Sequence, residues 1–428
     1  MMTPEACRGM LRDRESSAAR TALAVAVQGT LHDVRVRGDA ALVDHTRWYD
    51  RVSLERGRIE VEAAEMEQAR LSLSPDLVSA IDFAASSVRA FHLATAPRDE
   101  LYLAEGGIRC RRRVEPLGRV GLYSPGGFAG YPSSVIMTAC AAKGAGVDEI
   151  VLCTPPQMDG SVAPAVLYAA ARAGVSRVFR VGGAAAIAAM AYGTETIPAV
   201  DKIVGPGNEF VSHAKRIVYG QVGIDLIAGP SEVAVIADGD APVDIVASDL
   251  LAQAEHGTNS WAVLLTDSLP LMASVKRAVD DAGPAAGQIS CVVTGSLREA
   301  AALASELAPE HLEVFVRDPD PVLRTVRNCG AIFVGPYAGA PLGDYALGPN
   351  HVLPTGGSAR FSSGLSTLDF VRFTNVIEIT GRPSRELIEA CRVLAEAERF
   401  VRHAEAVRAR DSSLHAAPAR DTPPALGR

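Results

Sequence analysis

The pattern of apolar positions changes character near residue 119 of the chain. Before this point, residues such as Leu77, Ile81 and Val88 recur at helical spacing, which predicts a helix. The preceding Ser74-Pro75 is typical of a helix start, with serine as the cap and proline in the first turn. After residue 119, short β-branched runs alternate with alanine-rich stretches of helical pattern, and this alternation predicts an α/β protein with parallel sheets. The runs expected to form strands are residues 119–123, 149–153, 202–204, 233–236, 262–266, 290–293, 313–316 and 331–334.

These strands could close into one barrel or form two open sheets. We expect two open sheets, because loops rich in glycine and proline follow several strands, where doubly wound folds bind ligands. Residues 336–364 have the composition of a long loop, and a loop of this length is usually functional or disordered. We predict a further helix at residues 385–407. Beyond Ala409 the composition drifts to Ala, Pro, Arg, Asp and Ser, which predicts a disordered tail.

Composition then narrows the class of protein. The 428 residues include 42 Lys and Arg against 50 Asp and Glu, a net charge of −8. This balance argues against nucleic-acid binding, which requires a basic face. The chain contains no run of about 20 strongly apolar residues, so we expect no membrane span. The seven cysteines are scattered without a C-x-x-C pair, which predicts reduced thiols in a cytoplasmic protein.

Two loops are candidates for binding a phosphate or a nucleotide, although the dinucleotide fingerprint G-x-G-x-x-G is absent. The first, residues 123–127, follows a predicted strand and precedes a helix expected to begin near Pro132. The second, Gly205-Pro206-Gly207-Asn208, lies between a predicted strand and a helix expected at residues 208–219. Both place flexible backbone near a helix N-terminus, where amide groups favour anions. Each could equally be a tight turn without a ligand.

Gln253 and His256 are candidates for a metal site. They lie three residues apart on a predicted helix and therefore share one face. An amide oxygen and an imidazole nitrogen can both ligate a metal, but glutamine is an uncommon zinc ligand. The same spacing fits an ordinary polar contact at a helix end. The H-E-x-x-H pattern is absent, which excludes the zincin class of metalloprotease.

Glu310 and His311 adjoin at a predicted helix-to-strand junction. Either could act as a general base, and together they could serve two proton transfers. The alternative is a histidine that interacts with the negative end of a helix dipole.

Two further pairs of polar residues lie closer to the C-terminus. Asp344 and His351 lie in the long loop, and we expect a functional role because loops seldom retain such residues for packing. Glu398 and His403 are five residues apart on the predicted last helix. They do not share a face, so by themselves they are typical of solvated helix residues.

Many of these residues belong to short motifs that occur in a fixed order. The motifs are Gly121-Leu122-Tyr123 through Gly126-Gly127, Tyr131-Pro132-Ser133-Ser134, Gly205-Pro206-Gly207-Asn208, Ala228-Gly229-Pro230-Ser231-Glu232, Ala252-Gln253-Ala254-Glu255-His256, Pro309-Glu310-His311-Leu312-Glu313, Gly343-Asp344-Tyr345 and Asn350-His351-Val352-Leu353-Pro354-Thr355. With these motifs, the chain resembles the histidinol dehydrogenase family from about residue 20 to residue 410. Several motifs of five or more residues in one order make a chance similarity negligible.

The resemblance implies an NAD- and zinc-dependent oxidation of L-histidinol through L-histidinal to L-histidine, the last steps of histidine biosynthesis. It implies one Zn²⁺ per subunit, and Glu310 and His311 as catalytic bases. The implied zinc ligands are Gln253, His256, Asp344 and His403. The implied substrate-binding residues are Ser231, Gln253, His256, His311, Asp344, His351, Glu398 and His403. The implied NAD-binding positions are Tyr123, Asn208 and Ala185.

The resemblance also implies a domain organisation. The family fold has two incomplete Rossmann-like domains with parallel sheets and small helical terminal segments, in a homodimer whose active sites are shared between subunits. We therefore assign residues 1–20 to an N-terminal helical segment, residues 21–122 and 232–366 to a discontinuous first Rossmann-like domain, and residues 123–231 to the second. Residues 367–410 would form a C-terminal helical domain that reaches the partner subunit, before a disordered tail at residues 411–428.

Three positions depart from the family pattern, and one of them, Ser305, replaces a common asparagine ahead of Pro309. Ala185 replaces a glutamine that usually helps to hold NAD, and Leu347 stands where a small residue is usual. A paralogue that oxidises another amino or polar alcohol on the same scaffold is therefore one alternative. A non-enzymatic ligand-binding protein of two α/β lobes is the other, and the intact Glu310-His311 pair argues against it.

Overall fold

The computed structural model describes residues 3, 5, 17–126 and 130–412. Gly127, most of the predicted N-terminal segment and the predicted tail from residue 413 onward therefore lie outside the described residues. The chain forms two compact units. The first consists of Met1–Ala96 with Pro116–Phe370, and the second of Pro97–Glu115 with the chain from Val371 onward.

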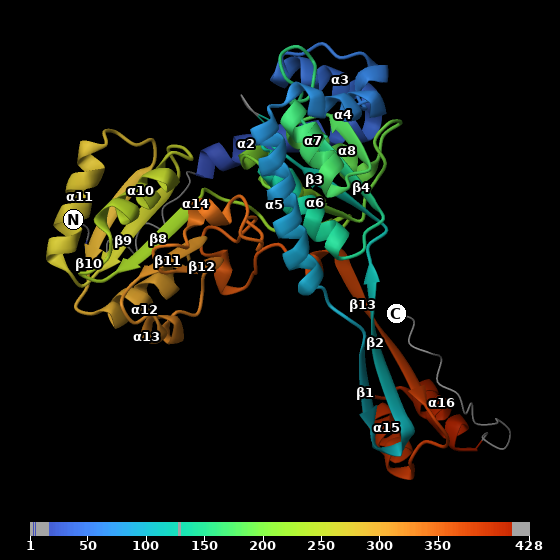
Figure 1. The fold of residues 1–428 in the computed structure, drawn as a ribbon. Helices are drawn as coiled ribbons and strands as arrows, with labels where there is room; N and C mark the ends of the chain where they lie inside the picture. Colours follow the sequence, from blue (N-terminus) through green and yellow to red (C-terminus); the bar gives the residue numbers. More distant parts are fainter. Residues whose placement is uncertain (1–2, 4, 6–16, 127–129, 413–428) are drawn as a thin grey trace. The chain divides into compact units, whose positions relative to one another are not determined.

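The first unit contains two five-stranded sheets, and all strand pairs in them are parallel (Figure 1). The strands of the first sheet are β3 (Arg119–Tyr123), β4 (Glu149–Thr154), β5 (Arg177–Arg180), β6 (Lys202–Val204) and β7 (Gly223–Ile224). Their order is β5-β4-β3-β6-β7. From β3 the chain therefore adds β4 and β5 on one side and then returns to the other side of β3 with β6. This reversal is a topological switch point, where open α/β sheets bind ligands beyond the carboxyl ends of the strands.

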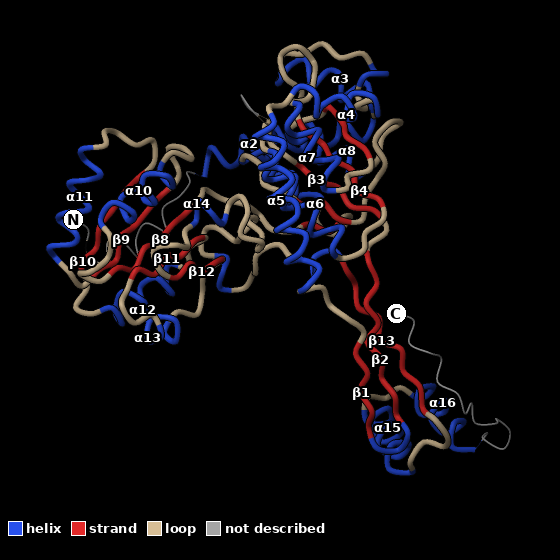
Figure 2. The backbone as a smooth tube through the Cα atoms, viewed as in Figure 1, coloured by secondary structure: helices blue, strands red, loops and turns tan. Residues whose placement is uncertain are grey.

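Helices cover both faces of the first sheet (Figure 2). Successive strand residues point to opposite faces, so Leu122 packs in one hydrophobic core and Tyr123 in the other. The helices that share the core of Leu122 are α5 (Pro75–Ala94), α6 (Pro132–Gly144) and α7 (Pro164–Ala173). Those that share the core of Tyr123 are α2 (Ser17–Arg37), α8 (Gly183–Tyr192) and α9 (Glu209–Val218). The shorter N-terminal helices are α3 (Asp39–His45), the π-helix η1 (Thr46–Asp50), the 3₁₀ turns η2 (Arg56–Arg58) and η3 (Ala69–Ser72), and α4 (Ala63–Gln68).

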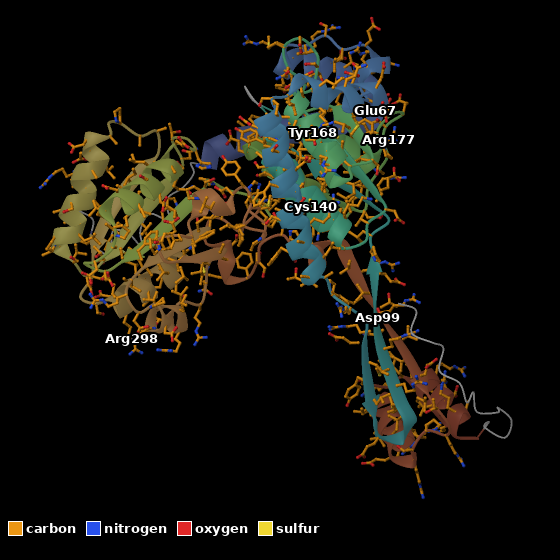
Figure 3. The ribbon with its side chains drawn as sticks, viewed as in Figure 1. Glu67, Asp99, Cys140, Tyr168, Arg177 and Arg298 are labelled. Atoms are coloured by element: carbon orange, nitrogen blue, oxygen red, sulfur yellow. The ribbon has the colours of Figure 1, made fainter. Side chains whose placement is uncertain are left out.

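Helix α5 begins where the sequence predicts. The hydroxyl of Ser74 accepts a backbone N–H of the first turn at 3.3 Å, which satisfies one of the free donors at the helix start. Cys140 on α6 and Tyr168 on α7 are labelled in Figure 3. The thiol of Cys140 lies 3.6 Å from the carbonyl of Ala85 on α5, and the Tyr168 hydroxyl donates to Asp82 at 2.9 Å. These bonds add directional contacts to the apolar packing of α5 against α6 and α7.

The second sheet repeats the same topology, with the strand order β10-β9-β8-β11-β12. Its strands are β8 (Glu232–Ala237), β9 (Trp261–Thr266), β10 (Gln288–Val293), β11 (His311–Phe315) and β12 (Ala331–Val334). β8, β9 and β11 are buried throughout, as expected for central strands covered on both faces. α10 (Val243–Ala254) and α11 (Leu269–Asp281) cover one face, and α12 (Leu297–Leu307) and α13 (Asp320–Thr325) cover the other.

All eight runs predicted as strands are strands, and the expectation of two open sheets rather than one barrel is confirmed. Within these two sheets, the sequence analysis missed β5 and β7, and outside them it missed the three strands of the second unit. β5 begins and ends with arginine, and β7 has only two residues, so neither presents a β-branched run. The predicted loop at residues 336–364 contains one short helix, α14 (Ala340–Gly343), and one 3₁₀ turn, η5 (Ser358–Arg360). A further turn, η6 (Thr367–Phe370), ends the unit.

The second unit combines a small sheet with two helices (Figure 2). Its strands are β1 (Glu100–Ala104), β2 (Ile108–Pro116) and β13 (Val371–Ile379), in the order β1-β2-β13, and η4 (Glu105–Gly107) joins the first two. β1 and β2 are antiparallel, with Ala104 opposite Ile108. The helices are α15 (Arg385–Ala397) and α16 (Val401–Ser412). None of the helices among the described residues is long and apolar enough to cross a membrane.

The prediction of one continuous helix at residues 385–407 was wrong. α15 ends at Ala397, and Arg399 adopts a left-handed conformation with φ of 63°. The N–H of Phe400 donates to the carbonyl of Ala395 at 2.8 Å, a closure typical of a helix C-terminus. Glu398 therefore caps α15, whereas His403 lies in the next helix, so these two residues do not share a helix.

Candidate active site

Glu310 and His311 lie at the amino edge of the second sheet, where β11 begins beside β8. The backbone of Glu232, the first residue of β8, holds both. Its N–H donates to Oε2 of Glu310 at 3.0 Å, and its carbonyl lies 3.2 Å from Nδ1 of His311. Because a carbonyl only accepts, Nδ1 carries the proton and Nε2 is the nitrogen left for chemistry. Nε2 lies 3.5 Å from Oδ1 of Asp344.

The charges of these groups depend on one another. Burial raises the pKa of Glu310 to about 7, although the charge of His311 acts in the opposite direction. Burial alone would lower the pKa of His311, but the carboxylates of Glu310 and Asp344 outweigh it and raise that pKa to about 9. Nδ1 of His311 is 3.7 Å from Oε2 of Glu310, so the charge of each group strongly affects the pKa of the other. Perturbed values of this kind are typical of groups that move protons.

Asp344 directly follows α14, and three histidines lie near enough to act on its carboxylate. Burial acts to raise the pKa of Asp344, but a hydrogen bond from His311 and the charges of His311, His351 and His256 hold it below its usual value. Nδ1 of His351 donates to the backbone carbonyl of Asp344 at 2.7 Å, which leaves its Nε2 for another partner. Burial lowers the pKa of His351, so its ring favours the neutral form that can ligate or accept.

Gln253 and His256 reach this edge from the C-terminal end of α10, which contacts α14. The side chain of Gln253 is 4% exposed, and its Nε2 has no hydrogen-bond partner among the described residues. Nδ1 of His256 lies 3.2 Å from the carbonyl of Ala252, so Nε2 is its free nitrogen. An unpartnered buried amide requires an explanation, because leaving such a group unsatisfied costs about 1–3 kcal/mol.

The side chains of Gln253, His256 and Asp344 are of types that can ligate a cation. Within the described residues, no three His, Cys, Asp or Glu side chains form a group suited to a metal ion. Of the four implied ligands, Gln253 is not one of those residue types, and His403 lies in the second unit. A glutamine, a histidine and an aspartate together supply N and O donors of the kind that zinc accepts.

A cavity of about 350 Å³ adjoins the site. His311, Asp344 and His351 line it, together with Leu347, so the departure noted at Leu347 faces the candidate substrate space. Ser231 directly precedes β8 at the same edge. Glu398 and His403 lie in the second unit, and their placement in this site stays a prediction.

The candidate cofactor residues lie at the carboxyl edge of the first sheet. Tyr123 ends β3, is buried, and accepts the N–H of Gly183 on its hydroxyl at 3.1 Å. Oδ1 of Asn208 accepts the N–H of Val211 at 3.1 Å and so caps α9, which leaves its NH₂ group for a ligand. Ala185 lies in the first turn of α8 and is 5% exposed. These positions flank the β3–β6 switch point, as a bound nucleotide requires.

Sequence reasoning missed the residues that hold the others in place. Glu232 positions Glu310 and His311 through its backbone, and its Oε1 accepts the N–H of Gly356 at 3.0 Å. Its signal was a charged residue at the start of a run of apolar strand residues. Lys215 is buried on α9 between Val211 and Val218, and its signal was a lysine on an apolar helix face.

The architecture and the buried proton-transfer pair define the class of protein. A doubly wound sheet leaves its switch point available to a nucleotide, and a second sheet holds the buried Glu310–His311 pair, with His311 in the wall of a cavity. Such a combination is typical of an α/β oxidoreductase.

Comparison with known proteins identifies the family. A family model described as histidinol dehydrogenase matches residues 12–411. The chain is 44% identical over 399 residues to the histidinol dehydrogenase of Methanosarcina barkeri, covering 91% of this chain and 92% of that protein. It is 45% identical over 392 residues to that of Rhizobium meliloti, covering 89% and 90%. The crystal structure of histidinol dehydrogenase from Elizabethkingia anophelis matches with a TM-score of 0.88 at 35% identity, covering 91% and 92%. The chain therefore belongs to the histidinol dehydrogenase family.

Proposed function

We propose that the protein oxidises L-histidinol through L-histidinal to L-histidine, the closing steps of histidine biosynthesis, with NAD as oxidant and one Zn²⁺ per subunit. The observation that carries the proposal is the Glu310–His311 pair, held by the backbone of Glu232 beside Asp344. NAD, when bound, accepts one hydride in each of the two oxidations. Each hydride that leaves carbon must be matched by a proton that leaves oxygen, and this is the work of the pair.

In the first oxidation, Nε2 of His311 accepts the proton of the alcohol. Its partner Nδ1 stays on the carbonyl of Glu232, which fixes the ring. The pKa of about 9 belongs to a ring that faces the negative charges of Glu310 and Asp344. A positive charge bound at Asp344 would lower the pKa of His311 toward neutral pH, because it would cancel part of the negative charge that the ring faces.

In the second oxidation, the aldehyde must first take up water. Glu310 removes the proton from that water, and its pKa of about 7 suits proton transfer near neutral pH. The hydrate then carries the former carbonyl oxygen as an alkoxide, and the loss of the second hydride from its carbon to NAD gives the carboxylic acid. Each of the two oxidations thus has its own base, His311 for the proton of the alcohol and Glu310 for the proton of the water.

Gln253, His256 and Asp344, with His403 as the fourth ligand, would hold the zinc ion. The ion would supply a fixed positive charge that binds and orients the imidazole and amine of the substrate. Gln253, which is buried beside the end of α10, would ligate through its amide oxygen, because its NH₂ group is only a donor. The remaining proposed substrate contacts are Ser231, His351 and Glu398.

The second unit supports a homodimer with shared active sites. Large apolar side chains of its strands and helices remain exposed although the unit is folded, and α15 has no buried residue. Such a surface in a soluble fold marks an interface. A second copy of the chain would cover it and place His403 and Glu398 in the neighbouring site. The exposed apolar residues are Leu101, Tyr102, Leu103, Phe373, Ile377, Ile379, Val393, Leu394, Phe400 and Val401.

One observation favours a second candidate function. Leu347 lines the cavity beside His311 and Asp344, and a larger side chain there narrows the space for substrate. A paralogue acting on another amino alcohol is therefore the alternative.

The yield of NADH tests both candidates. L-Histidinol supplied in limiting amount should give two NADH per molecule consumed, with histidine as the product. One NADH per molecule would mean that oxidation stops at the aldehyde. No NADH from histidinol, with turnover of a related amino alcohol, would establish the paralogue instead.

A further inference from the structure

Gly205 is held at both of its backbone polar groups by one buried ion pair. It directly follows β6 and opens the loop that ends at Asn208. Its N–H donates to Oδ2 of Asp225 at 2.8 Å, and its carbonyl accepts from Nζ of Lys215 at 3.0 Å. Lys215 and Asp225 also contact each other as an ion pair, and both side chains are 2% exposed.

The loop has little other freedom at this point. Gly205 has φ of +119°, in the region that favours glycine. A Cβ atom there would clash with the backbone carbonyl of Tyr123, so the loop lies directly against the end of β3. The ion pair therefore fixes the Gly205–Asn208 backbone at the switch point between β3 and β6.

Stability alone does not explain this pair. Two buried charges lose their hydration, and well-packed neutral residues in their place are often equally stable or more stable. Lys215 also interrupts the apolar face of α9, where Val211, Ala214 and Val218 are buried. A retained buried ion pair whose remaining bonds go to one loop residue indicates a role in shaping that loop.

We propose that Lys215 and Asp225 are positioning residues that hold the Gly205–Asn208 loop in the conformation that receives the dinucleotide. The inference rests on the proposed use of NAD. Lys215 lies on α9, which Asn208 caps, and Asp225 follows β7 with its N–H on the carbonyl of Ile203 in β6 at 3.3 Å. The pair thus links the loop to the helix after it and to both neighbouring strands.

The test removes both charges together, so that neither is left buried alone. In Lys215→Met/Asp225→Asn, the asparagine can still accept the N–H of Gly205, but the carbonyl of Gly205 loses its charged donor. We expect the NAD dissociation constant, measured by calorimetry without substrate, to rise about tenfold because the loop is no longer preorganised. The KM for histidinol at saturating NAD should stay within about twofold, and hydrogen exchange of residues 205–208 should accelerate.

Lys202→Met is the matched control. Lys202 begins the same strand β6, and its Nζ lies 3.3 Å from Oδ1 of Asp369, at the opposite end from the loop. Its loss should leave NAD affinity and exchange at residues 205–208 unchanged. If the double variant does not fold, Lys215→Arg takes its place: it keeps the charge opposite Asp225 but changes the geometry of the bond to Gly205, with an expected threefold rise in the NAD dissociation constant.

Two results would overturn the inference. One is unchanged NAD affinity in a folded variant. The other is an equal loss of affinity for NAD and histidinol with a lower melting temperature, which would make the pair a general structural element. Failure of the proposed function is distinguishable from both, because the wild-type protein itself would then bind no NAD in the same calorimetric measurement.

Discussion

The half-buried Asp249 and the buried Glu313 form a carboxyl pair behind the candidate site, and the protonation of this pair can be tested through stability. Asp249 lies on α10 one turn before Gln253, and Glu313 lies on β11 two residues after His311. Glu313 is fully buried, its Oε1 accepts the N–H of Ala340 at 2.8 Å, and its carboxyl lies near that of Asp249. Two carboxyl groups can share a hydrogen bond only when one of them holds a proton.

The size of the effect follows from the pKa of Glu313. Burial first, and then the charge of Asp249, raise it from 4.5 to about 8, while the charge of His311 acts in the opposite direction. The difference, 8 − 4.5, multiplied by about 1.36 kcal/mol per pH unit, is on the order of 4–5 kcal/mol. Because the folded-state pKa is the higher one, this stabilisation is fully present below pH 4.5 and is lost as the pH rises through 8.

Glu313→Gln removes the titration and keeps the geometry. The glutamine oxygen can accept the N–H of Ala340, and its NH₂ group can donate permanently to Asp249. We expect the variant and wild type to melt at similar temperatures at pH 5. The variant should then melt higher by a margin that grows to several degrees by pH 8, because only the wild type must ionise a buried group or hold its proton against the solvent.

Differential scanning fluorimetry between pH 5 and pH 9 measures this margin. Glu67→Gln, at an exposed glutamate on α4 (Figure 3), controls for the general effect of removing one negative charge. A difference in melting temperature between Glu313→Gln and wild type that is the same at pH 5 and pH 8 would refute the reasoning. It would mean that Glu313 does not hold a proton in the folded protein.

Three more outcomes are expected of the proposed site. The purified protein should contain about one divalent metal ion per subunit, and His256→Ala should retain less after dialysis by elemental mass spectrometry; full activity without metal would contradict this. Glu310→Gln should slow the oxidation of supplied histidinal more than that of histidinol, because an amide cannot take a proton from water, and equal losses in stopped-flow assays would argue against a step-specific base. Mixing Glu310→Gln subunits with His403→Ala subunits should restore about a quarter of wild-type activity, because about half of the dimers are mixed and each has one intact site of two. No recovery, with mixed dimers detected by native mass spectrometry, would remove the shared site.

The sequence was most informative where burial determines residue type. The central strands of both sheets are covered on two faces, so they required β-branched runs that can be recognised in the sequence. β5 was missed because it begins and ends with arginine, and the buried Arg180 has a structural role: it donates to the carbonyl of Glu60 at 2.8 Å. The end of α15 was also not predicted. Arg399 adopts a left-handed conformation there, and in a sequence this conformation is usually indicated by glycine or asparagine.

The residues of the candidate site also divide into those that the sequence indicates and those that only the structure reveals. Glu310, His311 and Asp344 could be found from the sequence because unusual polar residues lie at junctions and in a long loop. Glu232 and Lys215 were missed despite their positions in apolar segments, because the hydrogen bonds that give them their roles join parts of the chain that only the fold brings together. The sequence also placed Glu310 and His311 at a helix-to-strand junction, and they lie at the amino end of β11 rather than at the carboxyl edge that doubly wound sheets usually use.

Helix polarity gives a physical reason for the use of opposite edges. At the carboxyl edge of the first sheet, the helices α8 and α9 begin, and their free N–H groups and positive dipole ends suit the phosphates of a dinucleotide. At the amino edge of the second sheet, α10 and α12 end, just before His256 and Glu310. Their free carbonyls and negative dipole ends favour a cation and an imidazolium, and disfavour phosphate. Exchanging the two edges would place each charged ligand at the wrong pole, so one repeated βαβ topology can serve an anionic cofactor with one sheet and a metal with the other.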